Sequence, residues 1–178
     1  QFVQGGPFAH WHVLEQAIIY LISRANRSIA IETPYFLPTE NLNNALITAA
    51  LAGVKVELMI PDRTDSRLTT YAANSYLAQL LEAGVEVYRY KAGFLHSKLL
   101  LIDERIASIG SANMDFRSLE HNFEIAGILY DEGMTRRLRQ IFEEDKRSCL
   151  RLEAESWAQR GWRVRFAESF MRLFAPLL

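Results

Sequence analysis

The chain has 178 residues, which is the size of one domain or of half a longer protein. Hydrophobic residues make up 49% and charged residues 23%, so the composition is globular and argues against disorder. The formal net charge is −1, which argues against a protein that holds nucleic acid by bulk positive charge.

The first half of the sequence alternates helix and strand patterns. Helical apolar spacing covers 11–26, and a strand pattern follows at 28–33. A helix over 39–53, a strand over 54–61, a helix over 66–84 and a strand over 85–90 come next. This order predicts crossover connections and a mixed, largely parallel sheet with helices on both faces, which is an α/β fold.

The pattern changes at residue 93. We expect a hairpin of two strands, 96–102 and 105–109, then a loop or helical turn over 110–121 and a strand over 122–130. Helices are predicted over 132–147, 149–160 and 163–175. The sequence has no run of 18 apolar residues and no signal peptide, and because it lacks an initiator Met we expect it to be cut from a longer chain.

The stretch "GFLHSKLLLI" places a histidine and a lysine two positions apart in an apolar strand pattern. Alternate side chains of a strand share one face, so His96 and Lys98 would lie on the same face. Two groups that can be cationic are costly there unless an anion lies between them. Taken alone, a histidine on an apolar strand is more often a buried structural residue than a catalyst.

The hairpin brings further polar groups to this histidine. If 103–104 is the two-residue turn, Ile102 pairs with Arg105 and His96 falls opposite Ser111. Gly110 allows close approach of the backbone, and Asn113 lies just beyond. The resulting cluster of donors is suited to an oxyanion, and best to a phosphate group.

A catalytic histidine also needs its second ring nitrogen held by a partner. Glu124 is the preferred candidate, because it lies within an apolar strand where an unpaired carboxylate would be costly. Glu120 is expected to be solvated. The "HWH" at 10–12 begins a helix pattern, where alternate residues do not share a face, so packing or surface exposure is favoured over metal binding. Cys149 is the single cysteine, which excludes an internal disulfide and fits a reducing compartment.

The motif His96-x-Lys98-x4-Asp103-x6-Gly110-Ser111-x-Asn113 resembles, without a gap, the HxKxxxxDxxxxxxGSxN signature of the phospholipase D superfamily. The segments "TPYFLPTE", "AALAGVKVELMIPDRTDS", "SYLAQLLEAGVEVYRY" and "GSANMDFRSLEHNFE" resemble the C-terminal half of bacterial cardiolipin synthases. The resemblance covers nearly the whole chain. It implies that residues 1–178 form a single phospholipase D-type domain.

The resemblance implies a mechanism in which two such motifs meet at one site. One histidine attacks phosphorus, and the other donates and accepts protons. His96 would be the acid and base, and the nucleophile would lie in the N-terminal half of the parent chain. Lys98, Ser111 and Asn113 would stabilise the phosphoryl oxygens. Asp103 belongs to the motif, but its turn position favours a structural role. No cofactor or metal is implied.

For a cardiolipin synthase, the resemblance implies phosphatidylglycerol as donor and acceptor, with glycerol released. Tyr35, in a segment that ends a strand, is a weak candidate for substrate binding. The implied partners are the N-terminal half or a second copy of the chain, and no nucleic acid is expected. The parent protein is expected at the cytoplasmic face of a bacterial membrane, and this fragment is expected to be soluble or peripheral.

Three alternatives remain open at this stage. Water as acceptor would make the same site a phospholipase D-type phosphodiesterase. A homodimer with one motif in each chain could be a nuclease. An isolated half could also fold and be inactive.

The C-terminal segment is basic and aromatic. From Arg136 onward there are ten Lys or Arg residues and six Asp or Glu residues. Residues 160–178 carry one helical stripe and neighbouring cations, which is typical of helices that lie in a membrane interface. The candidate membrane contacts are Trp162, Arg163, Arg165, Phe166, Phe170 and Phe174, and Leu173 and Leu177 continue the stripe. The alternative is that the stripe packs on the domain.

Overall fold

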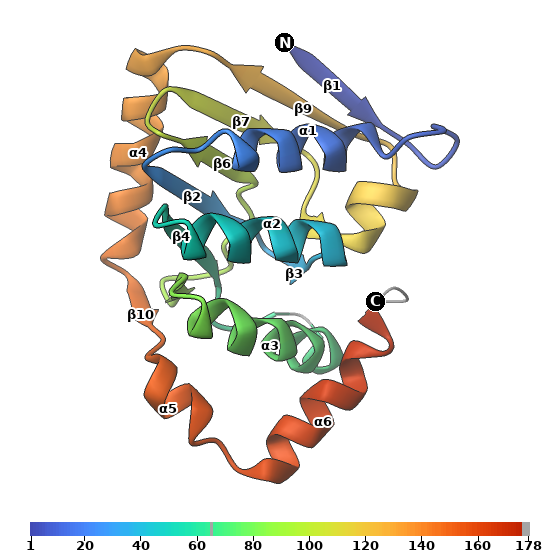
Figure 1. Cartoon of the computed structure of the whole chain (residues 1–178), viewed down its shortest axis with the longest axis vertical. Coiled ribbons are helices and arrows are strands. Elements are labelled where there is room, and N and C mark those ends of the chain that lie inside the picture. Colours follow the sequence, from blue (N-terminus) through green and yellow to red (C-terminus); the bar gives the residue numbers. More distant parts are fainter. Residues whose placement is uncertain (65, 176–178) are drawn as a thin grey trace.

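The structure is a computed structural model that describes residues 1–64 and 66–175. One large sheet, a two-stranded pair and flanking helices make up the fold (Figure 1). In chain order the elements are β1 (Phe2–Gly5), α1 (Val13–Ser23), β2 (Ser28–Glu32), β3 (Phe36–Leu37), α2 (Glu40–Leu51), β4 (Lys55–Pro61), α3 (Arg67–Glu82), β5 (Glu86–Tyr90), β6 (Leu99–Ile102), β7 (Ile106–Gly110), β8 (Met114–Asp115), the π-helix η1 (Arg117–His121), β9 (Glu124–Leu129), α4 (Glu132–Lys146), β10 (Cys149–Arg151), α5 (Ala154–Ala158) and α6 (Trp162–Arg172).

The large sheet is mixed, with the strand order β1-β9-β7-β6-β2-β4-β5-β10. Within the described residues, parallel pairing in this sheet is confined to β2, β4 and β5. The other five neighbouring pairs are antiparallel. The mixed α/β fold is confirmed, but a largely parallel sheet is not observed. The crossovers of the first half supply three strands, and the later strands join them as antiparallel neighbours.

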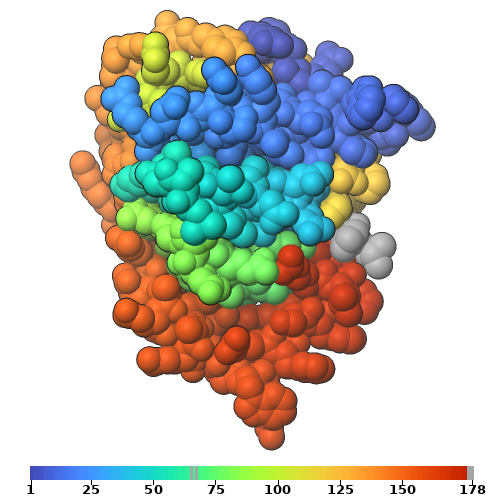
Figure 2. Space-filling model, viewed as in Figure 1, coloured from blue at the N-terminus to red at the C-terminus, as the bar shows by residue number. Residues whose placement is uncertain are grey.

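Side-chain alternation assigns the two faces of the sheet to different helices. Ile29 and Ile31 of β2 pack in a buried cluster with residues of α1, α2 and α3. These three helices form adjacent bands across one face of the molecule (Figure 2). Ala30, between the two isoleucines, lies in the opposite layer with the fully buried Phe142 of α4. Helices on both faces are therefore confirmed.

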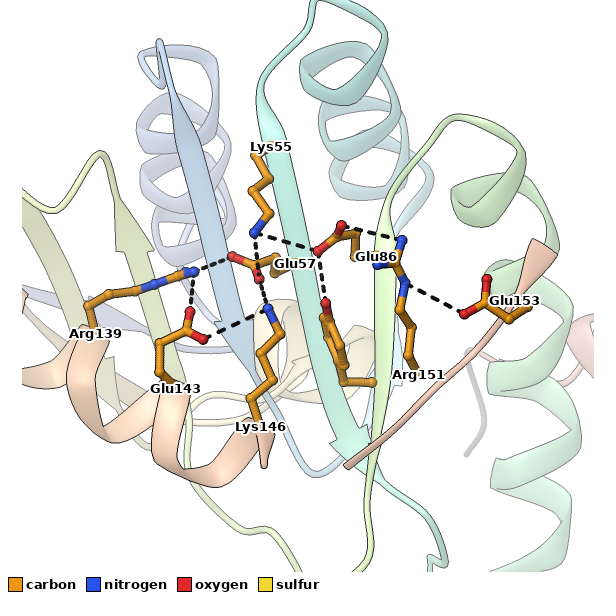
Figure 3. A network of polar contacts seen from close by, with 9 residues as sticks. Lys55, Glu57, Glu86, Arg139, Glu143, Lys146, Arg151 and Glu153 are labelled. Atoms are coloured by element: carbon orange, nitrogen blue, oxygen red, sulfur yellow. Dashed lines mark hydrogen bonds and ion pairs between the residues drawn. The ribbon is translucent and has the colours of Figure 1, made fainter. Parts of the chain in front are cut away.

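Helix α4 is also joined to the sheet by charged groups (Figure 3). Glu57 of β4 is fully buried, and its carboxylate accepts hydrogen bonds from Arg139 and Lys146 of α4. Lys55 donates to the same carboxylate at 3.1 Å. Burial alone would raise the pKa of Glu57, but the hydrogen bonds from Lys146 and Arg139 outweigh it and the pKa lies below its ordinary value. The helix is thus fixed by ion pairs as well as by apolar packing.

The sequence patterns do not predict four short strands, β1, β3, β8 and β10. The longest of them has four residues, which is too short for a periodic pattern. β10 lies where the helix over 149–160 was expected, so that prediction is wrong for its first turn. Residues 149–151 pair with β5 instead, and the helical part is reduced to α5.

The C-terminal helix α6 packs on α3 with one side and exposes the other. Arg172 lies over the Tyr76 ring at 4.3 Å, and the buried Glu168 accepts a hydrogen bond from Arg160. The predicted stripe faces outward, since Phe166 is 67% exposed and Leu173 is 72% exposed. Leu177, also predicted in the stripe, lies outside the described residues. Over the part of the chain that is described, no helix is long and apolar enough to cross a membrane.

Candidate functional site

The histidine and lysine of the motif lie on an irregular segment that leads into β6. β6 begins at Leu99, so His96 and Lys98 are just outside the strand that was predicted from 96. His96 is exposed and Lys98 is half-buried. The Phe94 ring stacks on the His96 ring, with centroids 5.7 Å apart and planes at 29°. The Lys98 Nζ donates to the His96 carbonyl oxygen at 2.9 Å, which folds the lysine back over its own segment.

The hairpin turn lies where it was predicted, but the register differs by one residue. The Arg105 amide donates to the Ile102 carbonyl oxygen at 3.0 Å, and residues 103 and 104 have φ of 52° and 54°. Ile102 nevertheless pairs with Ile106, so one extra residue separates the strands. The predicted pairing of His96 with Ser111 is therefore wrong, because a sequence does not show whether a turn residue is left unpaired.

Ser111 is hydrogen-bonded to the first two residues of β9, Glu124 and Ile125. Its amide donates to the Ile125 carbonyl oxygen at 2.9 Å, and its hydroxyl accepts from the Ile125 amide at 3.1 Å. The same hydroxyl donates to the Glu124 carboxylate. Gly110 makes this approach feasible, since a Cβ there would lie 2.2 Å from the Ile125 carbonyl oxygen. The predicted need for glycine at this point is confirmed.

Glu124 has different partners from the one that was expected. Its carboxylate accepts hydrogen bonds from Ser111 and, at 3.3 Å, from the Asn122 side chain. Among the described residues, it makes no hydrogen bond to His96. The carboxylate therefore fixes the segment that carries Ser111, and the half-buried Glu120 makes no hydrogen bond there either.

Asn113 is oriented by a carboxylate that the sequence patterns did not single out. Its Nδ2 donates to Asp115 Oδ2 at 3.0 Å, and the other oxygen of Asp115 accepts from the Ser118 amide at 2.7 Å. Asp115 is 9% exposed and lies in β8, which pairs in parallel with β3. The signal available in the sequence was a carboxylate two positions after Asn113 beside the apolar Met114.

Lys98 lies within the electrostatic field of both carboxylates. Burial lowers the pKa of Lys98, while Glu124 and Asp115 act in the opposite direction, and the pKa remains below its ordinary value. The site is therefore a set of donors with two carboxylates at its margin. It could hold an anion with Lys98, Ser111 and Asn113 while His96 stays accessible to solvent.

Asp103 lies at the other end of β6, in the hairpin turn. Its carboxylate accepts hydrogen bonds from the amides of Asn26, Arg27 and Ser28 at 2.8, 2.7 and 2.8 Å. Burial would raise the pKa of Asp103, but these backbone donors outweigh it and lower the pKa. The geometry gives Asp103 a role in joining the turn to the loop before β2, away from His96.

A groove opens beside the histidine. It has a volume of about 760 Å³, and its lining includes Tyr35, Arg63, Tyr90, Lys91 and Phe94. Tyr35 is half-buried, and its ring lies 6.4 Å from the Phe94 ring, whose other neighbour is His96. Tyr35 thus borders the site.

The described residues offer no group of three His, Cys, Asp or Glu side chains that could hold a metal ion. His10 and His12 are exposed, and the His10 ring contacts the Trp11 ring edge-on with centroids 4.8 Å apart.

The sequence was compared with protein families and known proteins. Residues 18–146 match the family described as cardiolipin synthase, PLD-like domain. A cardiolipin synthase of Geobacillus kaustophilus (strain HTA426) is 46% identical over all 178 residues, which cover 36% of that protein. Cardiolipin synthase 1 of Staphylococcus aureus (strain COL) is 42% identical over the same span and also covered to 36%. The chain thus spans about a third of the length of the curated relatives it matches.

Solved structures support the fold. A phosphatidylserine synthase of Haemophilus influenzae Rd KW20 superimposes with a TM-score of 0.81 at 18% identity, covering 100% of this chain and 47% of that one. The phospholipase D family member Nuc from Salmonella typhimurium gives a TM-score of 0.73 at 18% identity, covering 86% of this chain and 98% of that one. Since the family match extends over most of the chain and the fold agrees, the chain belongs to the cardiolipin synthase, PLD-like domain family.

Proposed function

We propose that this chain is one catalytic half of an enzyme that transfers a phosphatidyl group between two phosphatidylglycerol molecules, making cardiolipin and releasing glycerol. The observation that carries the proposal is that Lys98, two residues from the exposed His96, lies in the field of Glu124 and Asp115, the carboxylates that hold Ser111 and Asn113. The similarity to cardiolipin synthases over the full chain supports the choice of substrate.

The proposed reaction divides one displacement into two. A histidine of the second half attacks phosphorus, a P–N bond forms, and the bond from phosphorus to the glycerol oxygen breaks. His96 donates a proton to that oxygen as glycerol leaves. His96 then accepts a proton from the hydroxyl of the second phosphatidylglycerol, whose oxygen attacks phosphorus as the P–N bond breaks.

The remaining site residues act on charge and orientation. Lys98 and the amide of Asn113 would bind the non-bridging oxygens, where negative charge gathers during transfer. Asp115 would hold the Asn113 side chain in position, and Glu124 would hold Ser111. The exposure of His96 supports a site that is completed by the second half or by a second copy of the chain.

The outward aromatic stripe of α6 supports contact with an anionic membrane. Trp162, Phe166, Phe170 and Phe174 are 73%, 67%, 52% and 40% exposed, and Arg163 and Arg165 lie beside them. Aromatic rings and cations are typical of helices at the boundary between lipid headgroups and acyl chains. The proposed location is the cytoplasmic face of the membrane, where the lipid substrate lies.

The test is phosphatidylglycerol turnover on anionic liposomes by the longer parent protein, its His96→Ala variant and this chain alone. We expect the parent to form cardiolipin, the variant to lose turnover by about a hundredfold or more, and the chain alone to be inactive unless it dimerises. Phosphatidic acid as the main product would favour a phospholipase D-type phosphodiesterase. Cleavage of DNA with no lipid turnover would favour a nuclease.

A further inference from the structure

A buried carboxyl group lies directly beneath the segment that carries His96 and Lys98. Glu32, the last residue of β2, is 2% exposed and pairs with Leu99, the first residue of β6. The Ser97 hydroxyl donates a hydrogen bond to Glu32 Oε2. The second oxygen, Oε1, is buried and has no hydrogen-bond partner among the described residues. Buried carboxyl oxygens without partners are uncommon and call for a physical explanation.

The surroundings of Glu32 favour an uncharged carboxyl group. Within the described chain no cation pairs with it, unlike Glu57, whose carboxylate accepts from three cationic side chains. The ionisable groups that interact with it electrostatically are Asp145 of α4 and Cys149 of β10, and Lys146 is engaged with Glu57. Burial, and then the charge of Asp145, raises the pKa of Glu32, although the bond from Ser97 acts in the opposite direction. Burial likewise raises the pKa of Cys149 to about 11, so the thiol adds no negative charge at neutral pH.

The segment between β5 and β6 has no regular secondary structure. Residues 91–98 form no strand or helix, so their conformation depends on individual contacts, such as the bond from the Lys91 amide to the Ser148 carbonyl oxygen. Leu95, Leu99 and Leu101 lie in the layer of α4, and Ser97 reaches Glu32 on that side. The Phe94 and His96 rings stack on each other and are exposed, whereas Leu95 between them is buried, so the His96 ring does not lie in this layer. The hydrogen bond between Ser97 and Glu32 therefore fixes the segment from below.

We propose that Glu32 is a positioning residue whose carboxyl group holds Ser97 and thereby sets the orientation of His96 and Lys98 toward the phosphate. Ser97 occupies a position that the HxK motif leaves open, so neither residue belongs to the motif. A charged carboxylate beneath the site would repel the phosphate, whereas a neutral one keeps the hydrogen bond without the repulsion. The proposal rests on the proposed phosphate chemistry at His96.

The test uses Glu32→Gln, Glu32→Ala and Ser97→Ala, with inorganic phosphate as the probe. NMR signals of the His96 ring, assigned with a His96→Gln variant, report phosphate binding and ring mobility in this chain. We expect Glu32→Gln to bind phosphate within about twofold of the unmodified chain, because the amide is neutral and of similar shape. Glu32→Ala and Ser97→Ala should weaken binding by about tenfold and broaden the His96 signals, since small displacements in such sites have large effects.

The pH dependence of phosphate binding distinguishes a positioning role of Glu32 from a purely structural one. As the pH rises through the raised pKa of Glu32, the carboxylate forms and phosphate binding should weaken. Glu32→Gln cannot ionise, so this part of the profile should flatten. In the longer parent, the same variants should lower kcat more than they change KM.

Glu15 is the matched control. It is also 2% exposed and accepts a hydrogen bond from the Thr39 hydroxyl, but it makes no hydrogen bond to residues 91–98. Glu15→Gln and Glu15→Ala should leave phosphate binding unchanged. Equal losses in the Glu15 and Glu32 variants, or equal losses in Glu32→Gln and Glu32→Ala, would overturn the proposal.

The proposal remains testable if a variant does not fold or if the lipid assay fails. If Glu32→Ala does not fold, the Ser97→Ala variant replaces it in the test. That substitution removes only a hydroxyl group from an exposed residue, so the variant should still fold. Unchanged phosphate binding in Ser97→Ala would then refute the proposal. Phosphate binding and the His96 signals do not require lipid turnover, so failure of the cardiolipin assay would not be confused with failure of this proposal.

Discussion

The charged form of Lys98 is disfavoured in the folded state relative to the unfolded chain. Its pKa is lowered by burial, which Glu124 and Asp115 only partly offset. Because the unfolded chain then holds the proton more tightly, this lysine reduces stability at neutral pH. The cost diminishes as the pH rises through the lowered pKa toward the ordinary lysine value.

We expect Lys98→Met to leave the free energy of unfolding unchanged or higher at neutral pH, while phosphate binding is lost. Urea denaturation and phosphate titration measure the two effects, and Arg137→Met serves as a control at an exposed cation outside the groove. A drop in stability of more than about 1 kcal/mol would mean that Lys98 is needed for the fold.

In contrast to Lys98, the charged form of Asp103 stabilises the fold, because its carboxylate accepts hydrogen bonds from backbone amides. Asp103→Asn replaces one carboxylate oxygen with an NH₂ group that faces backbone donors, so we expect a loss of about 1–3 kcal/mol at neutral pH. The contribution of Asp103 is present above the ordinary aspartate pKa and is lost as the pH falls through its lowered pKa. Urea denaturation at neutral and acidic pH should show the difference from Asp103→Asn shrinking in acid.

The control for this prediction is Glu104→Gln, in the same turn. Glu104 is exposed and no hydrogen bond to its side chain is found in the described chain, so the substitution should have little effect. If the loss of stability in Asp103→Asn were the same at neutral and acidic pH, the stabilising hydrogen bonds could not depend on the charged carboxylate of Asp103.

At the scale of elements, α6 offers a separable test of membrane contact. The opposite side of α6 packs on α3, with Arg172 over the Tyr76 ring, so the exposed stripe can be changed without opening the fold. A variant with Phe166→Ser, Phe170→Ser and Leu173→Ser should bind phosphatidylglycerol vesicles on the order of a hundredfold more weakly, because three apolar side chains no longer enter the lipid.

The control is Leu51→Ser, at an exposed apolar residue at the end of α2 (71% exposed). Sedimentation with vesicles gives the partition coefficients, and phosphatidylcholine vesicles test the role of charge. Unchanged binding of the triple variant would mean that the stripe is covered by protein in the parent, and a loss of dimerisation in that variant would identify a second copy of the chain there.

The long elements could be predicted from sequence because their signals are local. Thr39 caps α2 through the Leu42 amide, and Gly53 and Gly84 adopt positive φ where α2 and α3 end. The short strands and the pairing register could not be predicted from the sequence, because they depend on contacts with distant segments. The one-residue shift beyond the hairpin turn is set by the unpaired Arg105, which has no signature in the sequence.

At the scale of the whole molecule, the motif predicted which residues gather but not how they are held. His96, Lys98, Ser111 and Asn113 come from one end of the sheet, as their spacing indicated. The supporting carboxyl groups escaped prediction, because Asp115 and Glu32 have ordinary sequence surroundings and gain their partners only through tertiary contacts.

The meander of β6, β7 and β9 has a consequence for how the molecule folds. His96, Ser111, Asn113 and Glu124 all lie within residues 96–124, in or next to strands that pair across the hairpin turn or across the segment between β7 and β9. Closing such short loops costs little chain entropy, so this part can form early. β1 must instead find β9 across most of the chain, with Phe2 facing Gly127. A late-forming edge strand would thus leave the residues of the site already assembled, and nascent chains could gain the arrangement around His96 before folding is complete.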